Sequence, residues 1–93
     1  MLNVQRSQQF KKDYKKAVKR GFPIDELKAV VTILMEEKEL PTKFRDHALN
    51  DSRDYKNKRE CHIRADWLLV YEIKKDLLIL ELVRTGTHSD LYR

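Results

Sequence analysis

The 93-residue sequence has few of the residues that crosslink or interrupt a chain: one cysteine, two glycines and two prolines. The single thiol, Cys61, cannot form an internal disulfide, so nothing here indicates an oxidising compartment. With so few glycines and prolines we expect no flexible linker. The length favours one domain, residues 1–93, with one modest core.

Long apolar runs are also missing. None approaches the roughly 20 residues that span a bilayer, and the first residues contain no apolar core of a signal peptide. We therefore expect a cytoplasmic protein with no membrane contact. The sequence also has no glycine-rich phosphate loop, no HExxH motif and no GxSxG motif. Nucleotide hydrolysis, zinc proteolysis and α/β-hydrolase chemistry thus lack their signatures.

Charge is abundant and unbalanced. Lys and Arg number 20 and Asp and Glu 15, which gives a net charge of +5. A small basic domain favours polyanionic partners such as nucleic acid, through electrostatic steering and counterion release. The same charge is equally consistent with a surface that only aids solubility.

Hydrophobic periodicity predicts an α+β fold. Leu2 and Val4 indicate a short first strand. A helix over 8–20 should follow, capped by Ser7 and ended by Gly21, with Phe10, Tyr14, Ala17 and Val18 on its apolar face and lysines opposite. A second helix should begin near Pro23 and end before Pro41. After a polar, turn-rich segment at 42–54, strands are expected at 55–64, 67–73 and 77–83, and the tail should be a strand end with a short polar segment.

The predicted order is β-α-α-β-β-β. Hairpin-spaced final strands imply a small, mainly antiparallel twisted sheet. We expect both helices to pack on one face of this sheet, which would leave the other face open for a large partner.

Three histidines, His47, His62 and His88, are the candidates for proton transfer near neutral pH. Cutting an RNA phosphodiester requires a base for the 2′-OH, an acid for the leaving 5′-oxygen and cations for the phosphoryl charge. Two or three imidazoles and an arginine suffice for this without a metal. Taken singly, each histidine is more often a surface residue without a role.

Strand alternation places Glu60, His62 and Arg64 on one face, and Cys61 and Ile63 on the face toward the helices. Glu60 could then orient the imidazole of His62.

Further along, Gly86 permits a sharp turn, so Arg84 and His88 could both project at the sheet edge. Asp66 could be a turn residue. Trp67 could be an exposed platform for an RNA base, although composition alone favours a core aromatic. The histidines lack the short local spacing of most zinc sites, so we expect no metal and no cofactor.

Three segments resemble the YafQ subgroup of the RelE/ParE toxin superfamily: residues 45–49, 59–71 and 84–92. The likeness covers nearly the whole chain. It implies an mRNA endonuclease that cuts in the ribosomal A site, inhibits translation and is held inactive by a cognate antitoxin. Contact with operator DNA would come only through the antitoxin complex.

The resemblance also assigns roles by position. It implies a catalytic set of His47, His62, Asp66 and His88, with Arg84 as the phosphate-binding cation and with Trp67, Tyr92 and Glu60 on the substrate-binding side. Glu60 stands where relatives often have Asp, and Tyr92 where they often have Phe. We expect His47 or His62 as the base, assisted by Asp66, and His88 as the acid.

Two alternatives remain. One is a non-enzymatic member of the same superfamily, such as a ParE-like gyrase poison, against which the three histidines argue. The other is a basic RNA- or DNA-binding module without catalysis, in which histidine substitutions would leave the effect unchanged.

Overall fold

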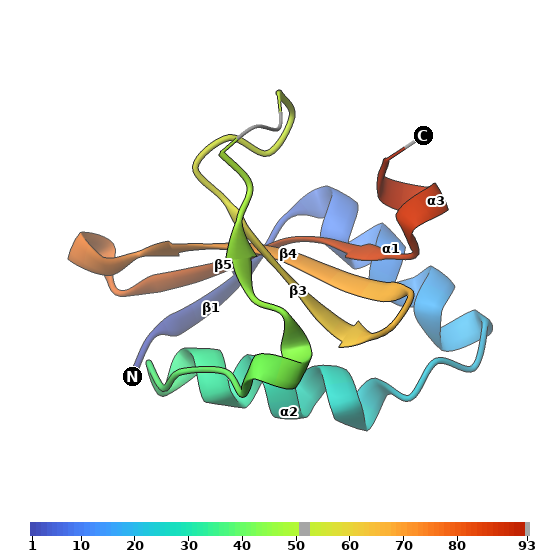
Figure 1. Ribbon diagram of the computed structural model, residues 1–93, viewed down its shortest axis with the longest axis horizontal. Helices are drawn as coiled ribbons and strands as arrows, with labels where there is room; N and C mark the ends of the chain where they lie inside the picture. The colour runs from blue at the N-terminus through green and yellow to red at the C-terminus, as the bar shows by residue number, and fades with distance from the viewer. Residues whose placement is uncertain (51–52, 93) are drawn as a thin grey trace.

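The computed structural model describes residues 1–50 and 53–92, and it confirms the α+β class (Figure 1). From the N-terminus onward, the elements are β1 (Asn3–Arg6), α1 (Gln8–Lys19), α2 (Ile24–Met35), the 3₁₀ helix η1 (Thr42–Phe44), β2 (His47–Ala48), β3 (Arg59–Arg64), β4 (Trp67–Lys74), the 3₁₀ helix η2 (Lys75–Leu77), β5 (Ile79–Gly86) and α3 (His88–Leu91). They form a five-stranded sheet in the order β1-β5-β4-β3-β2. Only β1 and β5 pair in parallel, so the sheet is mainly antiparallel, as predicted.

The first helix begins and ends close to where its signals predict. The Ser7 side chain accepts a hydrogen bond of 2.9 Å from the backbone N–H of Phe10. Gly21 follows the helix with φ of 77°, a conformation that costs glycine little. One helix-face assignment is wrong, because Val18 is exposed and does not join the apolar face.

The main core lies between the two long helices and one face of the sheet. Its members include Phe10, Leu27, Val30, Leu69 and Leu80. Cys61 and Ile63 belong to the same cluster, which confirms that they face the helices. In the part of the chain that the structure describes, no helix is long and apolar enough to cross a membrane.

The opposite face of the sheet is less open than we expected. A second apolar cluster of Tyr55, Leu68, Val70 and Leu91 covers part of it, with Leu49 and Val83 packed against the cluster. Leu91 comes from α3, which lies on the side of the sheet away from α2 (Figure 1).

Three local features differ from the sequence-based expectations. The segment at 42–54 contains η1 and the two-residue strand β2, and the tail contains the short helix α3. The hairpin turn is shifted, because Lys74 is the last residue of β4 and η2 forms the turn. Asp51 and Ser52, in the 42–54 segment, and Arg93, at the end of the tail, lie outside the described residues.

The strict alternation of β3 also fails at its end. A register shift between His62 and Arg64 turns Arg64 away from the face that carries Glu60 and His62. The Arg64 guanidinium instead binds Glu26 of α2, with N–O distances of 2.9 and 2.6 Å. Placing Arg64 on the histidine face was therefore wrong.

Candidate active site

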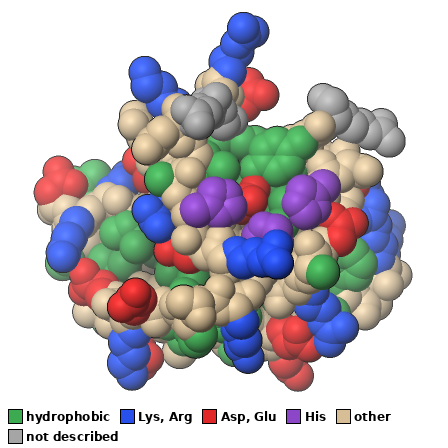
Figure 2. All heavy atoms as spheres, viewed as in Figure 1, with side chains coloured by type: hydrophobic (Ala, Val, Ile, Leu, Met, Phe, Trp, Pro, Cys, Tyr) green, Lys and Arg blue, Asp and Glu red, His purple; other side chains and the backbone are tan. Residues whose placement is uncertain are grey.

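The three histidines, far apart in the sequence, form a row on one face of the molecule (Figure 2). The ring centroids of His47 and His62 are 6.3 Å apart, and those of His62 and His88 are 5.6 Å apart. The short strand β2 makes this possible, because it pairs His47 directly opposite Glu60 of β3. His47 and His88 are about half exposed, whereas the His62 side chain is 14% exposed.

Glu60 is the buried anion of the row. Its residue is 4% exposed. Its Oε1 lies 3.4 Å from Nε2 of His47 and 3.6 Å from Nε2 of His62. On the other side of its ring, His47 donates from Nδ1 to the carbonyl oxygen of Arg45 at 2.7 Å. This arrangement holds the His47 ring in one orientation and places a carboxylate where a positive charge on either imidazole would be stabilised.

Tyr92 completes this cluster from the C-terminal segment. Its hydroxyl donates to Oε2 of Glu60. Burial and this hydrogen bond raise the pKa of Tyr92 above its ordinary value, so the hydroxyl keeps its proton at neutral pH. The Tyr92 ring packs edge-on against Tyr55, with centroids 5.8 Å apart.

His88 is held by Asp66, the residue in the turn between β3 and β4. Oδ1 of Asp66 accepts from the backbone N–H of His88 at 2.8 Å and from its Nδ1 at 2.6 Å. These two bonds keep the pKa of the Asp66 carboxyl below its ordinary value. Because Nδ1 carries the proton that Asp66 accepts, Nε2 of His88 is the atom available for proton exchange.

The local structure around His88 is fixed by α3. Thr87 and Asp90 form a capping box at the start of this helix. Gly86 is needed just before it, because a Cβ at this position would lie 2.9 Å from the Asp90 side chain. The turn at Gly86 therefore requires a residue without a side chain, because the Asp90 side chain lies too close to where a Cβ would be.

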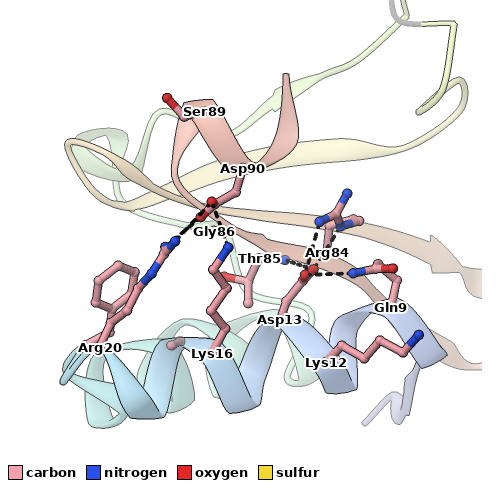
Figure 3. A pocket seen from close by; sticks show the side chains of 12 residues that line it. Gln9, Lys12, Asp13, Lys16, Arg20, Arg84, Thr85, Gly86, Ser89 and Asp90 are labelled. Atoms are coloured by element: carbon pink, nitrogen blue, oxygen red, sulfur yellow. Dashed lines mark hydrogen bonds and ion pairs between the residues drawn. The ribbon is translucent and has the colours of Figure 1, made fainter. Parts of the chain in front are cut away.

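Arg84 does not contact the histidines directly in this structure. Its guanidinium binds Asp13 of α1 through Nε at 2.8 Å and Nη2 at 3.1 Å (Figure 3). Asp13 also accepts from the backbone N–H of Thr85. The hydrogen bonds that Arg84 donates to Asp13 are the largest of the effects that raise the pKa of Arg84, and interaction with Tyr55 adds to them. Arg84 is thus linked to the row through Tyr55 and Tyr92.

Trp67 is not an exposed platform. It is 2% exposed, belongs to the core on the helix side of the sheet and packs edge-on against Phe22, with ring centroids 5.1 Å apart. Its buried Nε1 has no hydrogen-bond partner among the described residues. The expectation that its ring could stack on an RNA base from the surface is wrong for this conformation, because β4 directs the ring toward the helices.

Two residues of this region were missed by sequence reasoning. Asp13 is the single acid among the lysines of α1, and its spacing from Phe10 and Ala17 puts it on the buried face. That pattern could have identified it as the partner of a buried cation. Tyr55 had no such signal, because its contacts come from chain segments distant in sequence.

Acid–base chemistry is what this arrangement can perform. It offers three imidazoles in a row, each with a carboxylate within 3.6 Å of a ring nitrogen. Within residues 1–50 and 53–92, no group of three His, Cys, Asp or Glu side chains is placed to hold a metal ion.

Comparisons with known proteins point to one family. A family model described as "Bacterial toxin of type II toxin-antitoxin system, YafQ" matches residues 2–93. The mRNA interferase toxin YafQ of Escherichia coli strain K12 is 37% identical over 91 residues, which are 97% of this chain and 95% of that protein.

Solved structures show the same fold. A metal-bound toxin from Helicobacter pylori matches with a TM-score of 0.91 and 46% identity, over 99% of this chain and 100% of that one. YafQ in the E. coli DinJ–YafQ complex matches with a TM-score of 0.89 and 35% identity, over 100% of both chains. This chain belongs to the YafQ family of bacterial toxins from type II toxin–antitoxin systems.

Proposed function

We propose that this protein is the toxin of a type II toxin–antitoxin pair and an endoribonuclease that cleaves mRNA in the ribosomal A site. The observation that carries the proposal is the row of His47, His62 and His88 with its two carboxylates. The family match and relatives named mRNA interferase support it. Since translating ribosomes are its target, we place its action in the cytoplasm.

His88 is the proposed general acid. When its ring is protonated at both nitrogens, Nδ1–H is held by Asp66 and Nε2–H is free to protonate the leaving 5′-oxygen. Because Asp66 contacts His88 and neither candidate base, it assists the acid, which corrects the expectation that it assists the base. Asp66 stabilises the imidazolium before the transfer and fixes the ring, as a carboxylate beside a catalytic histidine does elsewhere.

His47 or His62 is the proposed base. The imidazole that takes the 2′-OH proton becomes a cation, and Glu60 lies 3.4 or 3.6 Å away to stabilise it. The freed 2′-oxygen then forms a bond to phosphorus while the bond from phosphorus to the 5′-oxygen breaks. The proton taken by the base balances the proton given by His88.

Arg84 is proposed to stabilise the charge that builds on the phosphoryl oxygens. An arginine carries five N–H donors, and Asp13 accepts from two of its nitrogens. Asp13 therefore fixes the guanidinium plane without using all of its donors. Tyr92 and Glu60 are proposed to line the substrate side, whereas Trp67 supports the site from the core.

Metal-free catalysis remains part of the proposal. The H. pylori relative was solved with bound metal. Among the described residues of this chain, however, no three ligands are placed to hold an ion. The proposal assigns both proton transfers to histidine side chains.

A cognate antitoxin is the proposed partner, as for YafQ in its complex with DinJ. The exposed lysines of α1 and the net charge of +5 favour an acidic, partly disordered segment that folds on binding. It should cover either the histidine row or the lysine face of α1. A purified complex with no acidic antitoxin segment near either surface would contradict this proposal for how the toxin is inhibited.

The direct test is expression without a partner in cells, with protein synthesis followed by amino-acid incorporation and mRNA ends mapped at the same time. We expect protein synthesis to stop and cleaved mRNA ends to accumulate within translated codons. Unimpaired synthesis would contradict the proposal. Arrest of DNA gyrase with intact mRNA would favour the ParE-like alternative.

A further inference from the structure

A cavity of about 480 Å³ opens beside His62, between the end of β3, the 3₁₀ helix η1 and the start of α2. Cavities that bind small ligands are commonly of this size. The apolar floor of the cavity consists of Ala29, Ile63 and Ala65. The cavity is also lined by Glu26, Lys43, Phe44, Arg45 and Arg64.

Positive charge dominates the cavity wall, with three cations against one carboxylate. Arg64 is paired with Glu26 at 2.6 Å. Lys43 and Arg45 make no ion pair within 4.0 Å with any carboxylate in the described part of the chain, and both are exposed. Lys43 instead lies over the Phe44 ring, 5.1 Å from its centroid.

A second cavity, of about 290 Å³, lies between α1 and α3 and is also lined by cations (Figure 3). There, however, Arg20 and Lys16 bind Asp90, and Arg84 binds Asp13. Its positive charge is therefore largely compensated. In the cavity beside His62, a single carboxylate, Glu26, faces three cations: it binds Arg64 and interacts at longer range with Lys43.

The cavity is physically continuous with the histidine row. His62 lines the cavity and also contacts Glu60 in the row. Arg45 contributes its side chain to the cavity wall and its carbonyl oxygen to the hydrogen bond that holds His47. Figure 2 shows Lys and Arg side chains directly beside the three histidines on this face.

We propose that this cavity is a substrate subsite that binds the phosphate of the RNA nucleotide next to the cleaved bond. The inference rests on the proposed nuclease function and extends it. With the scissile phosphate at the histidine row, the neighbouring nucleotide reaches the space beyond His62. Lys43 and Arg45 neutralise its phosphate, and the apolar floor contacts its sugar. Glu26 binds Arg64 and reduces the net positive charge of the cavity.

The test is equilibrium binding of a fluorescent 2′-O-methyl RNA hexanucleotide of mixed sequence, which lacks the 2′-OH and cannot be cut. Fluorescence anisotropy is measured over a range of salt concentrations. Lys43→Ala/Arg45→Ala should weaken binding about tenfold. The slope of log K against log salt should shrink by about 0.7, since the two side chains together neutralise one phosphate of a single strand. Lys28→Ala/Lys75→Ala removes the same charge elsewhere on the surface and should bind like the wild type.

Glu26→Gln supplies a test in the opposite direction. It removes the carboxylate of the cavity and frees Arg64, so RNA should bind several-fold more tightly. A residue that mattered only for folding would not improve affinity when replaced. Thermal melting of each variant checks that it is folded.

The subsite is overturned if the wild type does not bind the hexanucleotide, if the Lys43/Arg45 variant binds like its control, or if Glu26→Gln fails to tighten binding. Because this assay contains no ribosome, ribosomal RNA cannot supply the phosphates. Cleavage of mRNA on programmed ribosomes by the wild type is measured in parallel. If the wild type cleaves mRNA but the variants bind RNA with unchanged affinity, the subsite alone is refuted. If the affinities of the variants change as predicted but the wild type does not cleave mRNA, the nuclease function is refuted and the cavity remains an RNA-binding site.

Discussion

The indole of Trp67 packs against Phe22 in the core, and this burial determines what its replacement should do. We predict that Trp67→Ala destabilises the protein by about 3–5 kcal/mol, as large-to-small changes in cores do. Trp67→Phe should cost less, because it keeps an aromatic ring and removes a buried N–H without a partner among the described residues. Urea unfolding measures both. If Trp67→Ala were as stable as the wild type and only RNA binding suffered, the ring would be exposed in solution.

The buried thiol of Cys61 should make stability depend on pH under alkaline conditions. Burial raises its pKa from 9.0 to about 12 in the folded chain. The stabilisation that the buried, neutral thiol gives the folded chain is fully present below about pH 9. It is lost as the pH rises toward 12, because the thiol of the unfolded chain ionises first. In that window the free energy of unfolding should fall by about 1.4 kcal/mol per pH unit from this group.

Cys61→Ala provides the comparison for this prediction. The variant should be less stable at pH 7 because it leaves a small cavity. Its stability should then fall less steeply than that of the wild type between pH 9 and 10.5, as measured by urea unfolding at each pH. Parallel curves for the two proteins would show that the thiol does not ionise differently on unfolding.

Local sequence patterns placed some of the candidate site residues, whereas the assignment of His47, which lies in the two-residue strand β2, came only from the resemblance to the YafQ subgroup. His62 followed from alternation in β3, and His88 followed from its place after Gly86. Trp67 was misplaced because an aromatic at the start of a strand can face either side of a sheet. Asp13 was missed because its partner, Arg84, is 71 residues away.

At the scale of elements, α3 positions His88, and Asp90 holds α3. Asp90 accepts from the backbone N–H of Thr87 and binds Arg20 and Lys16 of α1. We predict that Asp90→Ala lowers the cleavage rate by about 10- to 100-fold, because small misplacements of a catalytic group cost that much. The free energy of unfolding should fall by about 1–2 kcal/mol, since the change removes one half of a capping box and two solvent-accessible ion pairs.

Ser89→Ala is the matched control for this element, because Ser89 is an exposed residue of the same helix. It should keep the wild-type cleavage rate. Should Asp90→Ala cut as fast as Ser89→Ala, α3 would not depend on its contact with α1 for its position.

The elements themselves were predictable to different degrees. α1, α2 and the three C-terminal strands have strong periodicity, caps and turn signals, and the structure confirms them. Strand β2 has two residues, and it exists only because it pairs with β3, so no local pattern marks it. The register shift at Arg64 likewise depends on the partner strand and on Glu26 of α2.

At the scale of the whole molecule, two groups of cationic side chains lie on different elements: the lysines of α1, and Lys43, Arg45 and Arg64 around the cavity beside the histidine row. This separation allows one surface to face RNA while another remains available for an antitoxin. The sheet and the two long helices supply the rigid frame. The three proposed catalytic histidines lie in β2, β3 and α3, and Asp66 lies in the turn between β3 and β4.

Because every proton transfer is assigned to side chains, cleavage should survive removal of transition metals. Wild-type protein treated with EDTA and then freed of the chelator should cut mRNA on programmed ribosomes at its original rate, with magnesium kept constant for the ribosome. A rate lost after this treatment and restored specifically by zinc would refute the metal-free mechanism.

The measurement that tests the central claim most directly is single-turnover cleavage of mRNA on programmed ribosomes by folded His88→Ala. The His88 side chain is 53% exposed and lies outside both apolar clusters, so the variant should fold and still bind an antitoxin. We predict a rate lower than that of the wild type by about 10²–10⁴-fold, the usual contribution of a positioned general acid. A variant that cuts at the wild-type rate would show that His88 is not the acid and that the histidine row does not work as described.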